Sequence, residues 1–245
     1  MPASRPLLRR SRPRPRAARL LLLLPLLLPP AAGCGGPESG AGAAEGDGGG
    51  VAAPGPLFFP RRLTEPAPPT FRARFHTSAG EFVVEVHRAW SPHGADRFWN
   101  LVKHGYYDDT RVYRVVAGFM AQFGVHGDPV LGYQWRNSVI PDDPVVESNT
   151  RGRVSFARSG ANSRINEVFI NLRDNPSLDA EGFSPIGEVV EGMAVVDAFH
   201  AGYGDGPPRG DGPYQAQARA QGNAYLDTEF PELTRIERVT VTTGG

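Results

Sequence analysis

Polar and apolar positions along the chain fall into short runs, and the first two runs predict a hairpin. Residues 71–77 and 81–87 are rich in β-branched and aromatic residues, which favour strands. Residues 78–80, with the sequence Ser-Ala-Gly, separate these runs and favour a turn. Two such runs around a short turn predict a pair of antiparallel strands.

The spacing of apolar residues then becomes helical. One hydrophobic face is formed by Ala95, Phe98, Leu101 and Val102, which recur three or four positions apart. Ser91-Pro92 predicts the start of this helix, with serine at the N-cap and proline at the first helical position. Gly105 predicts its end, because glycine readily adopts the left-handed conformation of a C-terminal cap.

The remainder of the chain continues mainly with strands. Strand-favouring runs lie at 110–116, 120–124, 152–157, 167–172, 184–190 and 233–242. A second short helix is predicted over 191–199, where Met193, Val196 and Phe199 are apolar. Many short strands with two helices are typical of a closed antiparallel barrel, although this pattern alone does not separate a barrel from a sandwich. We therefore expect a mainly β domain over residues 71–245.

Composition sets the N-terminal region apart from that domain. A basic stretch at 5–19 is followed by the apolar run 20–28 and then by the small residues 31–33. This order is typical of a cleaved secretory signal peptide. The apolar run is also too short to span a bilayer, which takes about 20 residues. We predict a signal peptide over residues 1–33.

Cys34 is the only cysteine of the chain, so it has no partner for an internal disulfide. It directly follows the small residues and resembles the lipobox cysteine that carries lipid after cleavage, although Ala31 stands where leucine is usual. An ordinary signal peptide with a chance cysteine is the alternative. Lipidation at Cys34 predicts an exported protein, anchored to a membrane of the cell envelope. Residues 34–70 are rich in Gly, Ala and Pro and predict a disordered tether of the lipoprotein.

The formal net charge of zero hides an acidic mature chain. Residues 1–33 contain seven arginines and no acid, so their removal from the 26 basic residues leaves 19 against 26 acidic ones, a charge of about −7. Nucleic acids are bound through positive charge on the protein. The composition therefore argues against a nucleic-acid partner and is compatible with a neutral peptide.

Residues 112–122 carry the most specific motif. They read Val-Tyr-Arg-Val-Val-Ala-Gly-Phe-Met-Ala-Gln, which resembles the cyclophilin signature F-H-R-I-I-P-G-F-M-x-Q. Further blocks follow in the family's order at 152–157, 166–170, 178–179 and 186–193. The resemblance covers about residues 71–242. It implies a closed eight-stranded antiparallel barrel capped by two α-helices, a groove on the outer wall and peptidyl-prolyl cis-trans isomerase activity.

The resemblance also assigns roles to individual residues. Arg114 matches the catalytic arginine. The expected substrate-binding residues are Phe119, Met120, Gln122, Ala157, Phe169, Leu178 and Phe183. The implied partner is a proline-containing polypeptide, bound by a monomer that needs no metal and no cofactor.

Three positions depart from the pattern of eukaryotic members. Arg158 replaces an asparagine, Glu167 a glutamine and Ser177 a tryptophan. Glu167 adds a charge where an amide is expected, which affects the peptide preference of the groove. Arg158 and Glu167 motivate an alternative function, a chaperone-like module that binds proline-containing segments with little turnover.

An arginine suits the implied reaction for a chemical reason. Rotation of an Xaa-Pro bond passes through a state without amide resonance, against a barrier of about 18–20 kcal/mol. In that state the proline nitrogen regains a lone pair and accepts a hydrogen bond. A donor aimed at this nitrogen binds the transition state better than the substrate. Arginine is always protonated and presents a rigid fork of donors.

Overall fold

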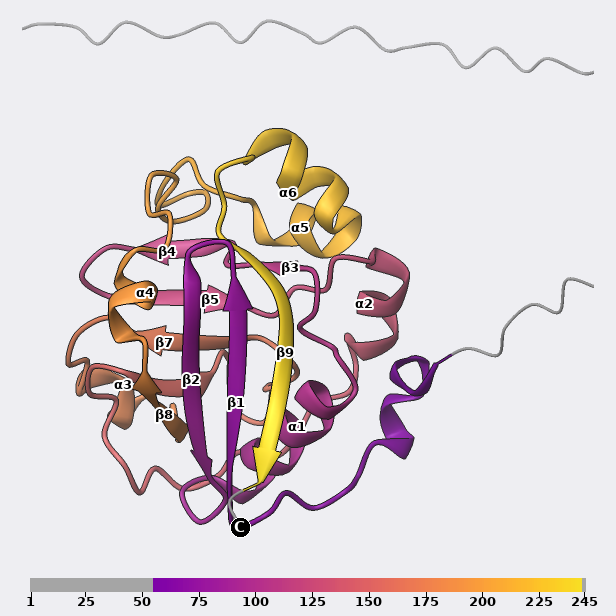
Figure 1. Cartoon of the computed structure of the whole chain (residues 1–245), viewed down its shortest axis with the longest axis vertical. Coiled ribbons are helices and arrows are strands. Elements are labelled where there is room, and N and C mark those ends of the chain that lie inside the picture. The colour runs from indigo at the N-terminus through magenta and orange to yellow at the C-terminus, as the bar shows by residue number, and fades with distance from the viewer. Residues whose placement is uncertain (1–54, 244–245) are drawn as a thin grey trace, which may run out of the picture. The chain divides into compact units, whose positions relative to one another are not determined.

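The computed structural model describes residues 55–243, which form one curled antiparallel sheet with helices around it (Figure 1). Its strands are β1 (Thr70–Thr77), β2 (Gly80–His87), β3 (Thr110–Arg111), β4 (Arg114–Val116), β5 (Met120–Phe123), β6 (Arg153–Phe156), β7 (Val168–Asn171), β8 (Pro185–Glu191) and β9 (Arg235–Thr243). The order in the sheet is β3-β9-β1-β2-β8-β6-β7-β5-β4. The predicted signal peptide and Cys34 lie outside the described residues.

The first strand explains how the core forms. Alternate side chains of β1 point inward, so that Phe71, Ala73 and Phe75 are fully buried. They pack against α1 (Pro92–Lys103), where the ring of Phe98 lies 6.4 Å from the ring of Phe71. The predicted hairpin of β1 and β2 is confirmed, with Thr77 opposite Gly80 at its turn.

Helix α1 begins and ends where the sequence predicted, but its N-terminus is capped by a different side chain. Gly105, at φ +71°, gives the predicted C-terminal cap, and the next amide, of Tyr106, donates to the carbonyl of Leu101. Ser91 stands at the N-cap, yet its hydroxyl donates to Asp143 and caps no amide. Asp143 instead accepts from the backbone amides of His93 and Gly94. A distant carboxylate therefore caps the helix.

The prediction of a closed eight-stranded barrel is wrong in its details. The expected strand 110–116 is split into β3 and β4, which stand at opposite ends of a nine-stranded sheet. Between them, the Val112 amide donates to the carbonyl of Thr234, and the Tyr113 side chain is buried. Only two residues join the end strands, so the sheet must curl until its two edges meet. No ladder pairs β3 with β4 among the described strands.

The expectation of two helices is also too low. α1 and α4 (Met193–Asp197) lie where helices were predicted. The other α-helices are α2 (Pro129–Trp135), α3 (Ser177–Ala180), α5 (Gln215–Gln221) and α6 (Asn223–Glu229), and two short 3₁₀ helices cover Pro56–Phe58 and Pro60–Arg62. The pattern of α5 and α6 was too weak to predict them, because each buries a single apolar side chain, Ala218 and Leu226 respectively. Figure 1 shows α5 and α6 stacked over β3 and β4, at one end of the sheet.

Residues 55–69 contact the domain, although the predicted tether extended to residue 70. The indole of Trp135 donates to the carbonyl of Leu57 at 2.9 Å, and that of Trp99 donates to Glu65 at 3.1 Å. Ala67 is buried. Residues 55–69 are too poor in apolar residues to form a core of their own, and hydrogen bonds from the two indole groups help to hold them on the domain.

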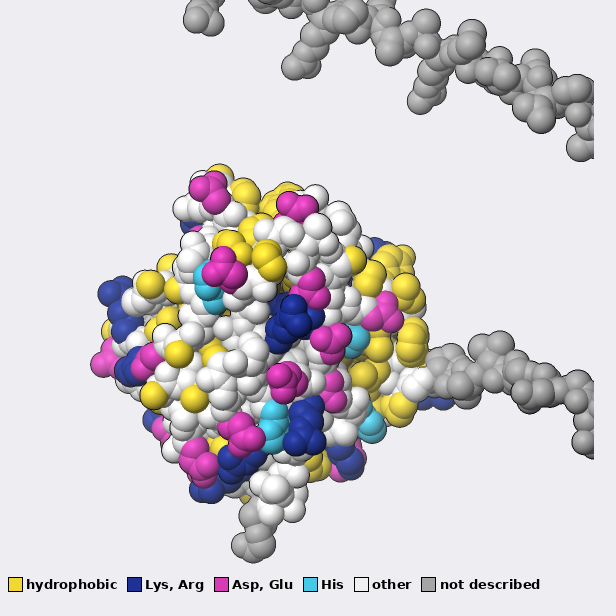
Figure 2. All heavy atoms as spheres, turned by 45° about the horizontal axis from the view of Figure 1, so that its top comes forward, with side chains coloured by type: hydrophobic (Ala, Val, Ile, Leu, Met, Phe, Trp, Pro, Cys, Tyr) yellow, Lys and Arg dark blue, Asp and Glu magenta, His cyan; other side chains and the backbone are white. Residues whose placement is uncertain are grey.

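None of the helices within residues 55–243 combines the length and the apolar character needed to cross a bilayer. The same residues contain no group of three or more His, Cys, Asp or Glu side chains placed to hold a metal ion. On the face drawn in Figure 2, basic and acidic side chains are intermixed. On the outer side of the hairpin, for example, Arg72 pairs with Glu85 and Arg74 with Glu81.

Candidate active site

Strands β5 and β7 and helix α3 bring the predicted apolar residues into one cluster. Met120, Phe169 and Leu178 are buried at its centre. The ring of Phe183 lies edge-on to the ring of Phe169, with 5.5 Å between their centroids. Phe119 and Ala157 pack against the same cluster. All six apolar residues that the resemblance assigned to substrate binding therefore meet at one place, which we call the apolar pocket.

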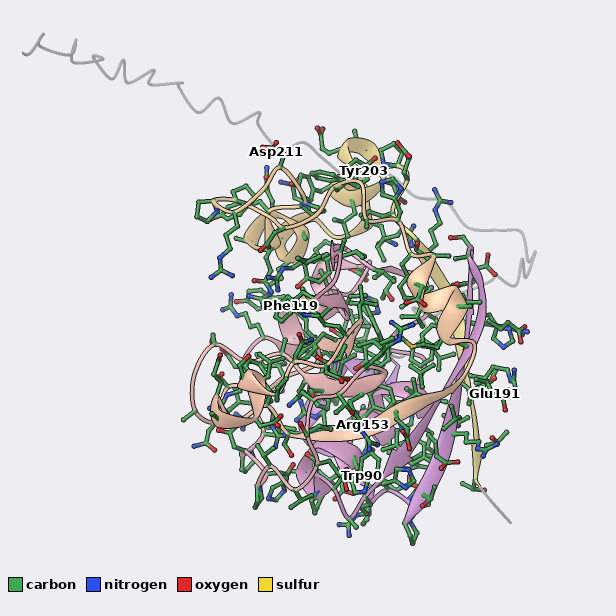
Figure 3. The ribbon with its side chains drawn as sticks, turned by 90° about the vertical axis from the view of Figure 1, so that its left-hand side faces the viewer. Trp90, Phe119, Arg153, Glu191, Tyr203 and Asp211 are labelled. Carbon is green, nitrogen blue, oxygen red and sulfur yellow. The ribbon has the colours of Figure 1, made fainter. Side chains whose placement is uncertain are left out.

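The apolar pocket is one part of a larger groove with a volume of about 1130 Å³. Arg114 and Gln122 line the groove beside the pocket. Beyond them the groove continues to α2 and α5, where Tyr133 and Arg219 line it. Phe119 lies on this side of the molecule, below the loop that carries Tyr203 and Asp211 (Figure 3). The predicted site residues thus share a single open groove.

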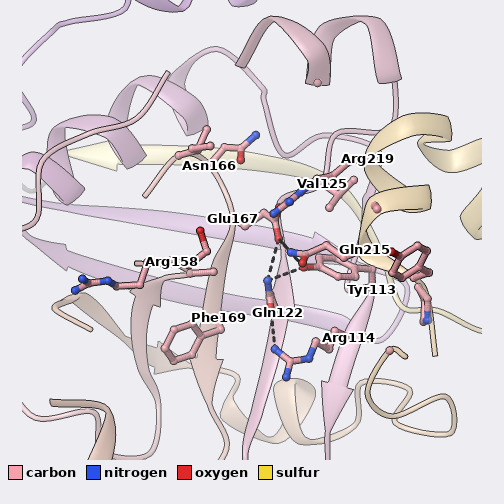
Figure 4. Close-up of a pocket in the computed structure, with 18 of the residues that line it drawn as sticks. Tyr113, Arg114, Gln122, Val125, Arg158, Asn166, Glu167, Phe169, Gln215 and Arg219 are labelled. Carbon is pink, nitrogen blue, oxygen red and sulfur yellow. Dashed lines mark hydrogen bonds and ion pairs between the residues drawn. The ribbon is translucent and has the colours of Figure 1, made fainter. Parts of the chain in front are cut away.

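Sheet pairing brings Arg114 to Gln122. These residues are directly opposite on the antiparallel strands β4 and β5, and Gln122 is opposite Phe169 on β7. Side chains at opposite positions lie on the same face of a sheet. Arg114 Nη1 donates to Gln122 Oε1 at 2.9 Å (Figure 4). The predicted catalytic arginine therefore lies beside the pocket, with its guanidinium held by a neighbouring strand.

Glu167 continues this line of hydrogen bonds. It is buried just before β7, and its Oε2 accepts from Gln122 Nε2 at 2.9 Å and from the Tyr113 hydroxyl at 2.5 Å (Figure 4). Burial, reinforced by the charge of Glu167, raises the pKa of Tyr113 well above its ordinary value. The hydroxyl therefore keeps its proton and acts as the donor. Instead of projecting a free charge into the groove, Glu167 is an acceptor within this line.

The charge of Glu167 is balanced from α5. Arg219 Nε and Nη2 both donate to Glu167 Oε1, at 2.8 and 2.5 Å. Gln215 Nε2 donates to Glu167 Oε2 at 2.7 Å. Sequence reasoning missed both residues, because α5 has almost no apolar periodicity and matches no block of the resemblance. Their role depends on α5 lying over the start of β7.

Asp205 holds the other end of the line. Its two carboxylate oxygens accept from Arg114 Nε at 2.7 Å and from Arg114 Nη2 at 3.1 Å. Burial disfavours ionisation of Asp205, but the hydrogen bonds and charge of Arg114 outweigh it and lower the pKa of this carboxyl. Asp205 was also missed, since it lies in the Gly- and Pro-rich stretch 202–213, outside every block of the resemblance. We call Asp205, Arg114, Gln122, Glu167 and Arg219 the polar row.

The other two departures from the eukaryotic pattern lie around the groove in different ways. Arg158 lines it, but its guanidinium is engaged, because Nη1 donates to the carbonyl of Gly182 at 2.7 Å and Nη2 lies 3.1 Å from Asp142. Ser177 begins α3 and is exposed. Neither residue displaces Arg114 or the apolar pocket.

Residues 72–218 match the family model "Cyclophilin type peptidyl-prolyl cis-trans isomerase/CLD". The chain belongs to this family. The predicted enzyme class, a peptidyl-prolyl cis-trans isomerase, is thereby confirmed. The match reaches into α5 and includes the apolar pocket and every member of the polar row except Arg219.

Individual relatives agree with this assignment. The chain is 31% identical over 131 residues to peptidyl-prolyl cis-trans isomerase B of Escherichia coli, covering 50% of this chain and 80% of the relative. It is 33% identical over 126 residues to peptidyl-prolyl cis-trans isomerase-like 3 of Rhizopus delemar, covering 48% and 74%. A crystal structure of a Cryptosporidium parvum cyclophilin type isomerase shares the fold, with a TM-score of 0.53 and 18% identity over 72% of this chain and 99% of that chain.

Proposed function

We propose that this isomerase accelerates rotation about Xaa-Pro bonds of exported proteins, with Arg114 as the donor to the proline nitrogen. The observation that carries the proposal is the position of Arg114, which lines the same groove as the apolar pocket. A proline-containing substrate is further supported by the Cryptosporidium parvum isomerase, which was also crystallised in the presence of the dipeptide Ala-Pro.

The apolar pocket would hold the proline ring while the rest of the peptide turns. Phe169 and Leu178 present buried hydrocarbon to the ring, and binding it there removes apolar surface from water. Holding the proline side of the bond in place also orients the amide that must rotate, so part of the binding energy lowers the barrier. The pocket supplies this hold without forming any covalent bond.

Arg114 would then stabilise the twisted amide. The planar substrate offers no lone pair on the proline nitrogen, whereas the twisted transition state does, so a donor at this point favours the transition state selectively. One well-placed polar donor is worth about 2.7–4 kcal/mol in other enzymes, which corresponds to about 10²–10³ in rate. Arg114 is partly buried, with 24% of its side chain exposed to the groove.

The decisive experiment compares the purified wild-type protein with Arg114→Ala in an Xaa-Pro exchange assay. We expect the variant to lower the rate of exchange by about 10²–10³-fold. An unchanged rate would contradict the proposed role of Arg114. Tight binding of Xaa-Pro peptides by a wild type that does not accelerate exchange would instead select the chaperone-like binding module.

We also propose that the protein acts outside the cytoplasm, anchored by lipid on Cys34. The proposal is supported by the basic, apolar and small-residue stretches that precede this lone cysteine. Each buried CH₂ of an acyl chain stabilises membrane association by about 0.8 kcal/mol. Mass spectrometry of the mature N-terminus should find cleavage before Cys34 and an acyl mass on it. An unmodified Cys34 thiol would contradict the anchor.

A further inference from the structure

The two ends of the polar row are held by one segment of chain that lies late in the sequence. Asp205 binds Arg114 across 91 residues, while Gln215 and Arg219 bind Glu167 across 48 and 52 residues. We propose that Asp205, Gln215 and Arg219 are positioning residues, which fix the orientation of Arg114 for catalysis. We call these three residues the clamp. This inference rests on the proposed role of Arg114.

The contact with Asp205 leaves donors of Arg114 available. A guanidinium carries five N–H groups. Nε and Nη2 each use one on Asp205, and Nη1 uses one on Gln122, so three are engaged and two remain. The two that remain belong to Nη1 and Nη2, at the tip of the side chain. Asp205 therefore binds the side of the guanidinium and leaves its tip for a substrate, as a positioning role requires and a blocking role does not.

The other end of the clamp fixes the direction of the Gln122 amide. Glu167 is an acceptor only, so Gln122 turns its Nε2 toward it. The amide oxygen of Gln122 then necessarily faces Arg114, where it accepts from Nη1. Arg219 and Gln215 keep Glu167 in place from α5. The carboxylate of Glu167 thus ensures that Gln122 presents its oxygen, and not its nitrogen, to Arg114. An amide at position 167 could also donate a hydrogen bond, so it would fix the orientation of Gln122 less strictly.

The loop that carries Asp205 is packed tightly enough to position it. The amide of Gly206 donates to Asp205 Oδ1 at 2.8 Å, and the amide of Gly212 donates to the Asp205 carbonyl at 2.9 Å. At Gly210, a Cβ atom would lie 2.4 Å from the carbonyl oxygen of Asp205, which is too close for any side chain. A glycine at position 210 is therefore required for the close approach of the loop to itself.

The test compares Asp205→Asn with Asp211→Asn in the full chain. Both substitutions remove one negative charge from the same loop, but Asp211 is exposed near the loop tip, where Figure 3 labels it. We expect Asp205→Asn to lower kcat about ten- to a hundredfold while KM changes less than about threefold, because the guanidinium is misplaced while the pocket is intact. Asp211→Asn should retain the kcat of the wild type.

A second measurement reads the contact itself. The Nε–H resonance of Arg114, identified by its absence in Arg114→Lys, should be protected from exchange in the wild type and in Asp211→Asn. It should lose this protection in Asp205→Asn, with an unchanged circular dichroism spectrum as the check on folding.

Three outcomes would overturn the proposal. A higher kcat in Asp205→Asn would show that Asp205 blocks Arg114. An unchanged kcat would show that catalysis does not depend on the contact between Asp205 and Arg114. An equal loss of kcat in Asp211→Asn would show that the effect comes from the net charge of the loop and not from the clamp. An inactive wild type would contradict the proposed function instead, and the Arg114 resonance would still report whether Asp205 holds the guanidinium.

Discussion

The apolar pocket and the polar row lie side by side in one groove but are assembled differently. The six side chains of the pocket come from residues 119–183 and pack around Met120, Phe169 and Leu178. The polar row takes two of its five members, Asp205 and Arg219, from a later segment. Hydrophobic contact is non-directional, so a few neighbouring elements suffice to form a pocket. Hydrogen bonds need matched atoms at fixed angles, and here these come from a distant part of the chain.

The two regions also differ in what a substitution should change. The polar row contains two arginines and two carboxylates, Arg114 and Arg219 with Asp205 and Glu167, so its charges balance. Removing one member leaves its partner incompletely satisfied, which is costly where that partner is buried. Removing a wall of the pocket leaves a cavity instead. A cavity at a buried ring costs about 3–5 kcal/mol and an unsatisfied buried polar group about 1–3 kcal/mol, so the larger loss of stability should mark the pocket. Loss of turnover should mark the polar row.

The largest effect on stability is expected from Phe169→Ala. Phe169 is 4% exposed and packs on Phe183, so the substitution should lower the free energy of unfolding by about 3–5 kcal/mol and raise KM for a proline peptide. Chemical denaturation measures the first effect and exchange kinetics the second. Phe59→Ala, at a ring that is 40% exposed, is the matched control and should change stability by less than about 0.5 kcal/mol. Equal losses in both variants would contradict the assignment of Phe169 to a buried wall.

Arg114→Lys should lower turnover strongly and change stability little, the converse of Phe169→Ala. Lysine keeps the positive charge but lacks the planar fork, so it cannot bind both oxygens of Asp205 and also reach Gln122. We expect the rate of Xaa-Pro exchange to fall by about a hundredfold, with little change in the denaturation midpoint. A lysine variant with nearly wild-type turnover would show that a positive charge is sufficient for catalysis and that the planar guanidinium is not required.

Arg219→Ala should lower both the stability and the turnover of the protein moderately. Glu167 would keep its bonds from Gln122 and Tyr113 but lose both donors to Oε1. Since the Arg219 side chain is 58% exposed, water can replace part of the loss, and we expect about 1–2 kcal/mol of destabilisation by thermal or chemical unfolding. Glu167→Gln in the same background should recover part of it, because the unpaired charge is gone. No recovery would indicate that Arg219 stabilises by packing rather than by its charge.

The smallest expected effect is the pH dependence of the Asp205–Arg114 pair. The pKa of Asp205 is lower in the folded protein than its ordinary value of 3.8, so the folded state binds fewer protons in acid. The stabilisation is therefore fully present above that value and is lost as the pH falls through the lower folded pKa. The difference in unfolding free energy between wild type and Asp205→Asn should be about 1 kcal/mol or less at pH 7 and smaller still at pH 3. A difference that grows in acid would contradict the pairing.

Sequence patterns were sufficient for the elements that bury a regular face. The hairpin of β1 and β2, helix α1 with its glycine cap, and α4 all lie where the spacing of apolar residues predicted them. Helices α5 and α6 were missed because each buries one apolar residue. The split of 110–116 into two strands was also missed, since that segment is β-favouring throughout. The break arises because 110–112 bond to residues 234–236, far along the chain, whereas 114–116 pair with the nearby residues 120–122.

The sequence by itself determined the family, the apolar residues of the pocket and the place of Arg114, because these lie in contiguous motifs whose spacing is fixed by strands and turns. Only the tertiary structure decided how Arg114 is held. Asp205 and Arg219 reach the polar row because the sheet curls until β3 and β4 meet and the segment after α4 folds over that seam. A hydrogen bond between residues 91 positions apart leaves no periodic trace in a sequence, since its geometry is set by the whole fold.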